Sequence, residues 1–260
     1  MEIELRGKTV LITGGSKGIG LACAERFAAE GCTLMLVARS AETLESQRRR
    51  LGETYGVEVM VQPLDLGQSG SVDELQQCCP HPDVLVNNAG AIPGGDLNGV
   101  DETRWRKGWD LKVFGTINMT RAYHQRMCER GHGVIVNVVG LAGEKPDAGF
   151  VAGTTGNASL MAFTRAVGSI SLDHGVRVIA VNPGPVETDR IVTLLKTRAE
   201  SEKGDASRWR DYLKQLPMGR AARPEEVADV VAFLASPRAS YMSGVVITVD
   251  GGLGSRGSSF

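Results

Sequence analysis

Short apolar runs alternate with longer amphipathic segments along this 260-residue chain, and this alternation constrains its fold more than any other feature. Runs that are apolar at every position are typical of parallel strands covered by helices on both faces. Seven such runs with about six helical crossovers predict one doubly wound α/β sheet. The expected strands are 8–13, 32–38, 57–64, 83–87, 133–139, 176–182 and 245–249.

The amphipathic segments between these runs are predicted to be helices. We expect a break near Gly108 in the longest of them, and the polar segment 188–216 to be helical in pieces. Pro224 at the start of one segment is typical of the first turn of a helix. The expected helices are 18–30, 41–55, 69–79, 101–130, 154–174 and 224–235.

Composition excludes several classes of protein. Lys and Arg number 29 against 30 Asp and Glu, so the basic excess typical of nucleic-acid-binding proteins is missing. No run of 18 apolar residues predicts a membrane span, and the acidic start of the chain does not resemble a signal peptide, so we expect a cytoplasmic protein. The five cysteines form no CxxC pair, and no His, Cys and Asp cluster has ligand spacing, so we predict reduced cysteines and no metal.

A glycine-rich segment follows the first expected strand directly. Residues 13–20 read TGGSKGIG, with glycines in a GxxxGxG spacing between a strand and a helix. Glycines let a backbone turn sharply and approach a pyrophosphate, and the helix N-terminus then offers free N–H groups. The segment therefore predicts a dinucleotide site, and the alternative is a plain tight turn.

Further motifs follow the other expected strands. Asp65-Leu66 follows the third, Asn87-Asn88-Ala89-Gly90 closes the fourth, Asn182-Pro183-Gly184-Pro185 with Thr188 follows the sixth, and Asp250-Gly251-Gly252 follows the last. With these motifs the chain resembles the short-chain dehydrogenase/reductase family over nearly its whole length. The resemblance implies a single Rossmann-fold domain over residues 1–260, with a cofactor half at about 1–130 and a substrate pocket and lid at about 131–220. It also implies a homotetramer or homodimer.

The resemblance also assigns residues to a nicotinamide dinucleotide. The second expected strand ends at Arg39, where an acidic residue would bind the ribose 2′-hydroxyl of NAD(H). A guanidinium there, with Lys17 as a second cation, favours NADP(H) over NAD(H), and the alternative for Arg39 is a solvated residue at a helix start. The expected cofactor-binding residues are Gly14, Ser16, Lys17, Gly18, Ile19, Gly20, Arg39, Ser40, Asp65, Leu66, Asn88, Ala89, Gly90, Asn157, Pro183, Gly184, Val186 and Thr188.

The catalytic positions of the family hold unusual residues in this chain. The family uses a Tyr as proton donor, a Lys four residues later, a Ser after the fifth strand and an Asn in the long helix. Gly153, Asn157, Gly140 and Lys112 stand at these four positions. The Asn and Lys types are exchanged, so we hypothesise that Lys112 supplies the proton and Asn157 bonds the ribose. The alternative is that Lys112 is a structural lysine paired with a carboxylate.

The motifs leave three functions open. The first is an NADP(H)-dependent oxidoreductase with an atypical active site, which transfers hydride to or from a small carbonyl, imine or enone. The second is a non-redox lyase or isomerase on the same scaffold, and the third is an NADP(H)-binding regulatory protein. For all three we expect a small-molecule ligand and neither nucleic acid nor membrane as a partner. The segment 191–218 is predicted to be either a lid over the pocket or a helix packed on the body.

Overall fold

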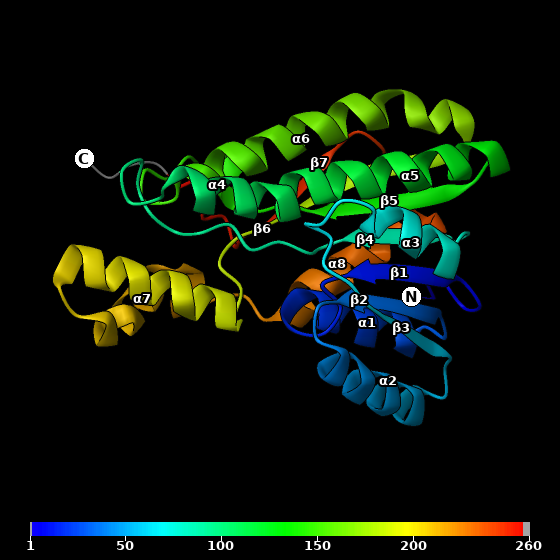
Figure 1. The fold of residues 1–260 in the computed structure, drawn as a ribbon, viewed down its shortest axis with the longest axis horizontal. Helices are drawn as coiled ribbons and strands as arrows, with labels where there is room; N and C mark the ends of the chain where they lie inside the picture. The colour runs from blue at the N-terminus through cyan, green and yellow to red at the C-terminus, as the bar shows by residue number, and fades with distance from the viewer. Residues whose placement is uncertain (1, 257–260) are drawn as a thin grey trace.

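The computed structural model describes residues 2–256 and confirms a parallel sheet with helices on both faces (Figure 1). The strand order is β3-β2-β1-β4-β5-β6-β7, so the direction of winding reverses between β1 and β4. All six neighbouring pairs are parallel. The strands are β1 (Thr9–Thr13), β2 (Thr33–Ala38), β3 (Val59–Pro63), β4 (Val84–Asn87), β5 (Gly133–Val138), β6 (Val176–Pro183) and β7 (Val246–Val249).

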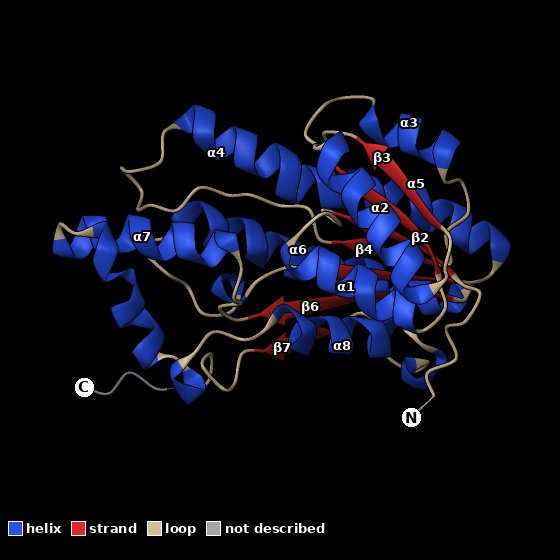
Figure 2. Ribbon diagram, turned by 90° about the horizontal axis from the view of Figure 1, so that it is seen from below, coloured by secondary structure: helices blue, strands red, loops and turns tan. Residues whose placement is uncertain are grey.

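Helices cover both faces of this sheet (Figure 2). On one face lie α1, α2 and α8, and on the other lie α3, α5 and α6. Within residues 2–256 no helix is both long enough and apolar enough to cross a membrane. The helices are α1 (Gly18–Ala29), α2 (Ala41–Tyr55), α3 (Ser71–Cys78), α4 (Glu102–Trp109), α5 (Gly115–Arg130), α6 (Val151–Ser171), α7 (Asp189–Lys203) and α8 (Pro224–Ala235).

The continuous apolar runs are explained by the two cores that they supply. Successive side chains of a strand point to opposite faces, so Val10 and Ile12 enter the core beneath α1 and α8. Leu11, between them, enters the core beneath α3 and α5, which also contains Tyr123. Most positions of a strand buried on both faces are therefore apolar, as the sequence pattern predicts.

The long helix 101–130 is interrupted, but not where the sequence analysis placed the break. Gly108 lies inside α4, and an added Cβ there would stand 2.9 Å from Cδ of Pro93, so this glycine allows close packing. The interruption is instead a π-helical turn at Asp110–Phe114, which joins α4 to α5 and contains Lys112. Such turns are rare and frequently occur at functional sites.

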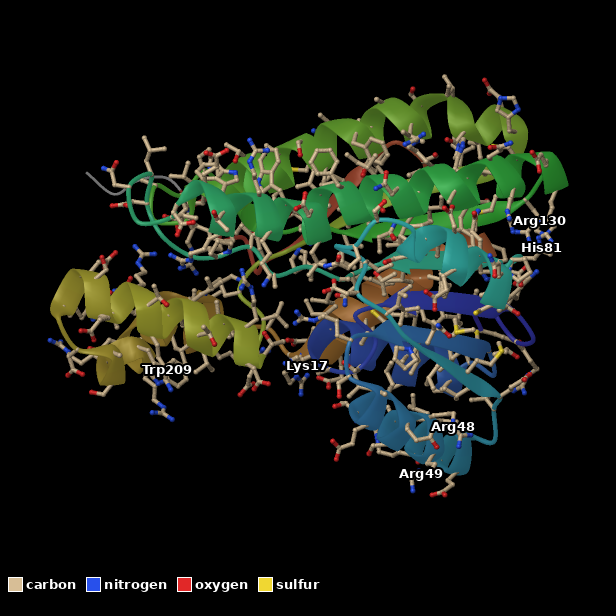
Figure 3. The ribbon with its side chains drawn as sticks, in the orientation of Figure 1. Lys17, Arg48, Arg49, His81, Arg130 and Trp209 are labelled. Carbon is tan, nitrogen blue, oxygen red and sulfur yellow. The ribbon has the colours of Figure 1, made fainter. Side chains whose placement is uncertain are left out.

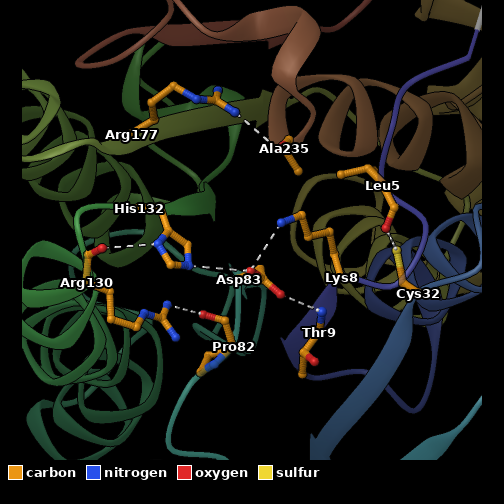
Figure 4. A network of polar contacts seen from close by, with 10 residues as sticks. All are labelled: Leu5, Lys8, Thr9, Cys32, Pro82, Asp83, Arg130, His132, Arg177 and Ala235. Atoms are coloured by element: carbon orange, nitrogen blue, oxygen red, sulfur yellow. Dashed lines mark hydrogen bonds and ion pairs between the residues drawn. The ribbon is translucent and has the colours of Figure 1, made fainter.

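Polar contacts hold the amino ends of the strands together (Figure 4). The Asp83 carboxylate accepts a hydrogen bond from the Thr9 amide at 2.9 Å and lies 3.5 Å from Nζ of Lys8. Close by, the Cys32 thiol donates to the Leu5 carbonyl at 3.2 Å. This end of the sheet is therefore closed, and the opposite, carboxyl end is the one that carries the cleft described below.

Candidate active site

One cleft of about 1980 Å³ lies at the carboxyl ends of the strands. The loops after β1, β2, β4, β5 and β6 line it, and α7 forms one wall. Ligands of open parallel sheets bind at this edge, at the point where the strand order reverses. Here that point lies between β1 and β4, next to the glycine loop.

The glycine loop is held against the end of β4 by a set of short polar contacts. Gly14 has φ +67°, and an added Cβ would stand 2.8 Å from Nδ2 of Asn88, so only glycine fits this turn. Asn88 Nδ2 donates to the Thr13 carbonyl at 3.1 Å. In return, Thr13 Oγ1 accepts from the amides of Asn88 and Ala89 at 2.9 and 3.0 Å. The two loops on either side of the reversal point therefore form one rigid unit.

The other two glycines of the motif bring the first helix close to its neighbours. An added Cβ on Gly20 would overlap the carbonyl oxygen of Gly14, so Gly20 lets α1 pack directly under the loop. Gly18 has φ +58°, and its added Cβ would lie 3.2 Å from Cγ2 of Thr188 at the start of α7. Gly18 lines the cleft, whereas Gly20 does not.

The N-terminus of α1 differs from that of α2. At α2 the Ser40 hydroxyl accepts from the Thr43 amide at 3.2 Å, which satisfies one free donor. At α1 the N-cap residue is Lys17, and within the described chain its side chain makes no capping hydrogen bond. The first-turn N–H groups of α1 thus face the cleft without a side-chain acceptor, which suits an anion such as a pyrophosphate.

Two cations stand at the adenosine end of the cleft. Arg39 is exposed, lines the cleft and forms no ion pair with any residue from 2 to 256. Lys17 lies between α1 and α7, where its Nζ is 4.0 Å from the Asp189 carboxylate with both side chains well exposed (Figure 3). An exposed pair of this kind is weak, so both cations remain available to a ligand.

Most of the expected cofactor residues line the cleft, and two do not. Gly20 lies beneath the loop, and the Asp65 carboxylate accepts a hydrogen bond from the Gly67 amide at 3.0 Å and so closes its own turn. The residues at the cleft wall are Gly14, Ser16, Lys17, Gly18, Ile19, Arg39, Ser40, Leu66, Asn88, Ala89, Gly90, Asn157, Pro183, Gly184, Val186 and Thr188.

Lys112 lies on the π-helical turn, at the wall of the cleft. Its side chain is buried, and an added Cβ on Gly90 would overlap its methylene stem, so Gly90 makes room for this lysine. Its Nζ donates to the carbonyls of Val138 and Val139 at 2.7 and 3.1 Å. Burial, and next the charge of Arg190, lower the pKa of Lys112 to about 8. In the described chain Lys112 pairs with no carboxylate, and the two carbonyls stand in place of the carboxylate partner that the structural alternative expected.

Asn157 and Gly140 stand in direct contact beside Lys112. Gly140 has φ +147°, and an added Cβ would lie 2.8 Å from Nδ2 of Asn157. A serine side chain at this position would meet both an unfavourable backbone conformation and the asparagine amide. The Gly140 amide donates to Oδ1 of Asn182 at 3.1 Å, which fixes the backbone where β5 ends.

Gly153 lies on α6, and its side-chain space is occupied. An added Cβ there would overlap the ring of Phe150, so this ring stands where a side chain at 153 would begin. Phe150 lines the cleft, whereas Gly153 does not. A tyrosine at 153 would therefore require Phe150 to move.

Glu144, in the loop after β5, is exposed but has two hydrogen-bond partners. Its Oε2 accepts from Asn182 Nδ2 at 2.8 Å and from Thr248 Oγ1 at 2.7 Å. The loop after β5 is thereby joined to the ends of β6 and β7. Nothing in the local sequence reveals this contact, because Glu144 and Thr248 are 104 residues apart.

Arg190 is a second residue that the sequence analysis missed. It lies in the first turn of α7, lines the cleft, and its Nη2 donates to the carbonyl of Ile92. Burial lowers the pKa of Arg190. Its charge contributes to the lowered pKa of Lys112, and both residues line the cleft.

The segment after Thr188 forms one wall of the cleft. The helix α7 packs against a 3₁₀ segment, Ala206–Gln215, and this pair stands away from the sheet, with Trp209 on its far side (Figures 1 and 3). Tyr212 Oη donates to Glu202 at 2.7 Å and holds the two pieces together. Within residues 2–256 no group of three His, Cys, Asp or Glu side chains is placed to hold a metal ion.

Comparisons with known proteins agree with this architecture. The family model described as enoyl-(acyl carrier protein) reductase matches residues 14–254. The 3-oxoacyl-[acyl-carrier-protein] reductase FabG of Aquifex aeolicus is 34% identical, over 97% of this chain and 100% of its own. Galactitol 2-dehydrogenase (L-tagatose-forming) of Cereibacter sphaeroides is 32% identical, over 96% of each chain. The structure of L-sorbose reductase from Gluconobacter frateurii with NADPH and L-sorbose has a TM-score of 0.88 and 32% identity, covering 98% of this chain and 100% of that one.

A doubly wound parallel sheet with a glycine loop at the reversal point defines the Rossmann-fold class. Within that class the family match spans almost the whole chain, and the relatives align from end to end. The chain belongs to the short-chain dehydrogenase/reductase family of oxidoreductases.

Proposed function

We propose that this protein is an NADP(H)-dependent oxidoreductase that transfers hydride to or from a small carbonyl, imine or enone substrate. The observation that carries the proposal is one continuous cleft that joins the glycine loop and Arg39 to the buried Lys112. One end of this cleft suits a dinucleotide, and the other holds a group able to give or take a proton. The NADPH and sugar substrate of L-sorbose reductase, and the carbonyl chemistry of the other relatives, support the same reading.

The residues at the glycine loop fit NADP(H). The free N–H groups at the start of α1 would hold the pyrophosphate, and Gly14 and Gly18 let the loop adopt the left-handed backbone turns that precede this helix. Arg39, with Lys17 and Ser40, would hold the ribose 2′-phosphate. Bound there, the cofactor supplies the hydride.

The other expected residues line the same cleft toward its chemical end. We propose that Asn157 bonds the nicotinamide ribose, and that the loop after β6 borders the nicotinamide ring. Leu66 and the loop after β4 complete the adenosine side. The residues proposed for these roles are Leu66, Asn88, Ala89, Gly90, Asn157, Pro183, Gly184, Val186 and Thr188.

Lys112 is the proposed proton donor, in an active site that lacks the family's usual Ser, Tyr and Lys. Gly140, Gly153 and Asn157 stand at those positions. An ammonium group has three N–H donors, and Lys112 uses two on the carbonyls of Val138 and Val139. The third is available to a substrate oxygen. A pKa of about 8 makes this group a much better acid near neutral pH than an ordinary lysine.

Titration of the purified protein with NADPH and separately with NADH tests the cofactor, with energy transfer from tryptophan to nicotinamide as the signal. Tight binding of NADPH and weak binding of NADH are expected. A panel of ketones, imines and enones then tests turnover through the loss of nicotinamide absorbance at 340 nm. Absence of binding for both nucleotides would contradict the proposal.

The ring of Phe150 in the side-chain space of residue 153 favours a second candidate function. This site has no room for the family's tyrosine as it stands, so the scaffold also suits a lyase or isomerase, or an NADP(H)-binding regulator. Consumption of a substrate without oxidation of NADPH would indicate a lyase or isomerase. Tight NADPH binding without turnover of any compound would indicate a regulator.

A further inference from the structure

Two cations face the substrate end of the cleft without an acidic partner. Arg190 donates to the carbonyl of Ile92, and Lys112 donates to two carbonyls at the end of β5. Neither forms an ion pair with any Asp or Glu from residue 2 to 256. Both residues line the same cleft, and the charge of Arg190 contributes to the lowered pKa of Lys112.

The other cations that line the cleft are exposed, and some of them are paired with acidic residues of the described chain, whereas Arg39, Arg104 and Lys145 are not. Arg198 on α7 lies 3.8 Å from the Asp147 carboxylate and 2.8 Å from that of Glu202. Lys17 has Asp189 at 4.0 Å. Arg190 is thus exceptional on its own helix, because it is less exposed than these groups and yet has no counter-charge.

The position of Arg190 in α7 adds to the electrostatic cost. A cation in the first turn of a helix faces the positive end of the helix dipole, which is unfavourable. A guanidinium has five N–H donors in a planar fork, and only one of them has a partner among the described residues. Such a fork matches the two oxygens of a carboxylate or phosphate group.

We propose, on the basis of the oxidoreductase function above, that the substrate carries an anionic group, a carboxylate or a phosphate, which binds to the Arg190 guanidinium while Lys112 faces the reducible group. The contact of Arg190 with Ile92, in the loop after β4, places it on the substrate side of the cleft rather than at the start of α1. The anion supplies the counter-charge that Arg190 does not have among residues 2–256. It also joins α7 to the body of the protein through the ligand.

The test compares Arg190→Gln with Arg198→Gln, a matched variant of a cleft cation that is already paired. The probes are acetoacetate against methyl acetoacetate, and dihydroxyacetone phosphate against dihydroxyacetone. Calorimetric binding to the NADPH-saturated protein is measured first, because it requires no turnover. Kinetics with the same pairs follow.

The wild-type protein is expected to prefer one anionic probe over its neutral partner. Arg190→Gln should weaken binding of that anion, or raise its KM, by about 10- to 100-fold, as for the loss of a charge-assisted hydrogen bond. The neutral probe, NADPH binding and the Arg198→Gln variant should be unaffected. The carboxylate and phosphate pairs show which anion the site takes.

Equal binding of anionic and neutral probes by the wild-type protein would overturn the inference. So would an Arg190→Gln variant that loses NADPH affinity to the same extent, because the guanidinium would then serve the cofactor. Anion binding that requires Arg190 but never oxidises NADPH supports this inference while contradicting the oxidoreductase function, so the two proposals fail separately.

Discussion

Two buried cations, Arg177 and Lys112, are satisfied in different ways. Arg177 lies on β6 and donates four hydrogen bonds, at 2.6 to 3.1 Å, to carbonyls of residues 234–239 at the end of α8. Figure 4 shows the bond to Ala235. Lys112 donates only two and borders the cleft. Burial lowers the pKa of both groups, to about 10 for Arg177 and to about 8 for Lys112.

The difference distinguishes a structural cation from one available for chemistry. Arg177 complements the negative end of the α8 dipole and supplies donors to carbonyls that the helix leaves free. Nearly all of its donors are used, and it does not line the cleft. Lys112 keeps one N–H donor without a partner among the described residues, and its ammonium group can lose a proton near physiological pH. Burial alone therefore does not identify a functional lysine or arginine, whereas unused donors at a cleft wall do.

The largest effect is expected for Lys112→Met. Removal of the proton donor should lower kcat for carbonyl reduction by about 10²- to 10⁴-fold. The Kd for NADPH should change little, and the free energy of unfolding should fall by only about 1 to 2 kcal/mol, because two carbonyls lose their donor while methionine fills the buried space. Lys145→Met removes an exposed lysine at the rim of the same cleft and serves as the control. If Lys112→Met keeps the wild-type kcat, Lys112 is not the proton donor, and its contrast with Arg177 does not hold.

Arg177→Met should act on stability instead. Four carbonyls lose their donor, so the free energy of unfolding should fall by about 3 kcal/mol in urea titrations. The kcat of the folded protein should be unchanged. Arg238→Met, at a half-exposed arginine near the same turn, should cost less than about 0.5 kcal/mol. If Arg177→Met instead lowers kcat and leaves the free energy of unfolding unchanged, Arg177 is not a structural cation.

Arg39 extends the comparison to an exposed cation without a partner. Arg39→Gln should weaken NADPH binding by about 10- to 100-fold and leave NADH binding unchanged, because only NADPH carries the 2′-phosphate. Arg49→Gln, on the exposed side of α2, is the matched control. Equal losses for the two nucleotides would show that Arg39 does not read the 2′-phosphate.

The smallest effect concerns the backbone beside Lys112. Gly140→Ala should lower the free energy of unfolding by about 1 to 2 kcal/mol, because its φ of +147° is strained for alanine and its Cβ would press on Asn157. Gly52→Ala, inside α2, should instead stabilise the protein by up to about 1 kcal/mol, because its added Cβ would lie in ordinary contact, 3.6 Å from the Val57 carbonyl oxygen. Chemical denaturation of both variants measures whether the free energy of unfolding falls in Gly140→Ala and rises in Gly52→Ala.

Much of the fold could be predicted from the sequence, because its strands are buried on both faces and their apolar runs are continuous. The glycine loop could also be predicted from the sequence, since Gly14 and Gly18 need backbone conformations that other residues avoid. The π-helical turn was not, because no local residue pattern marks it. Arg190 and Glu144 depend on partners 98 and 104 residues away, so their roles arise only when the chain has folded.

The pH dependence of kcat tests the central claim, that Lys112 supplies the proton, most directly. Reduction needs the ammonium form, which is present below a pKa of about 8 and is lost as the pH rises through it. Wild-type kcat for reduction should therefore fall above pH 8, and kcat for the reverse oxidation, which needs the neutral amine, should rise there. Lys112→Met should remove both transitions. An unchanged pH profile in this variant would contradict the account.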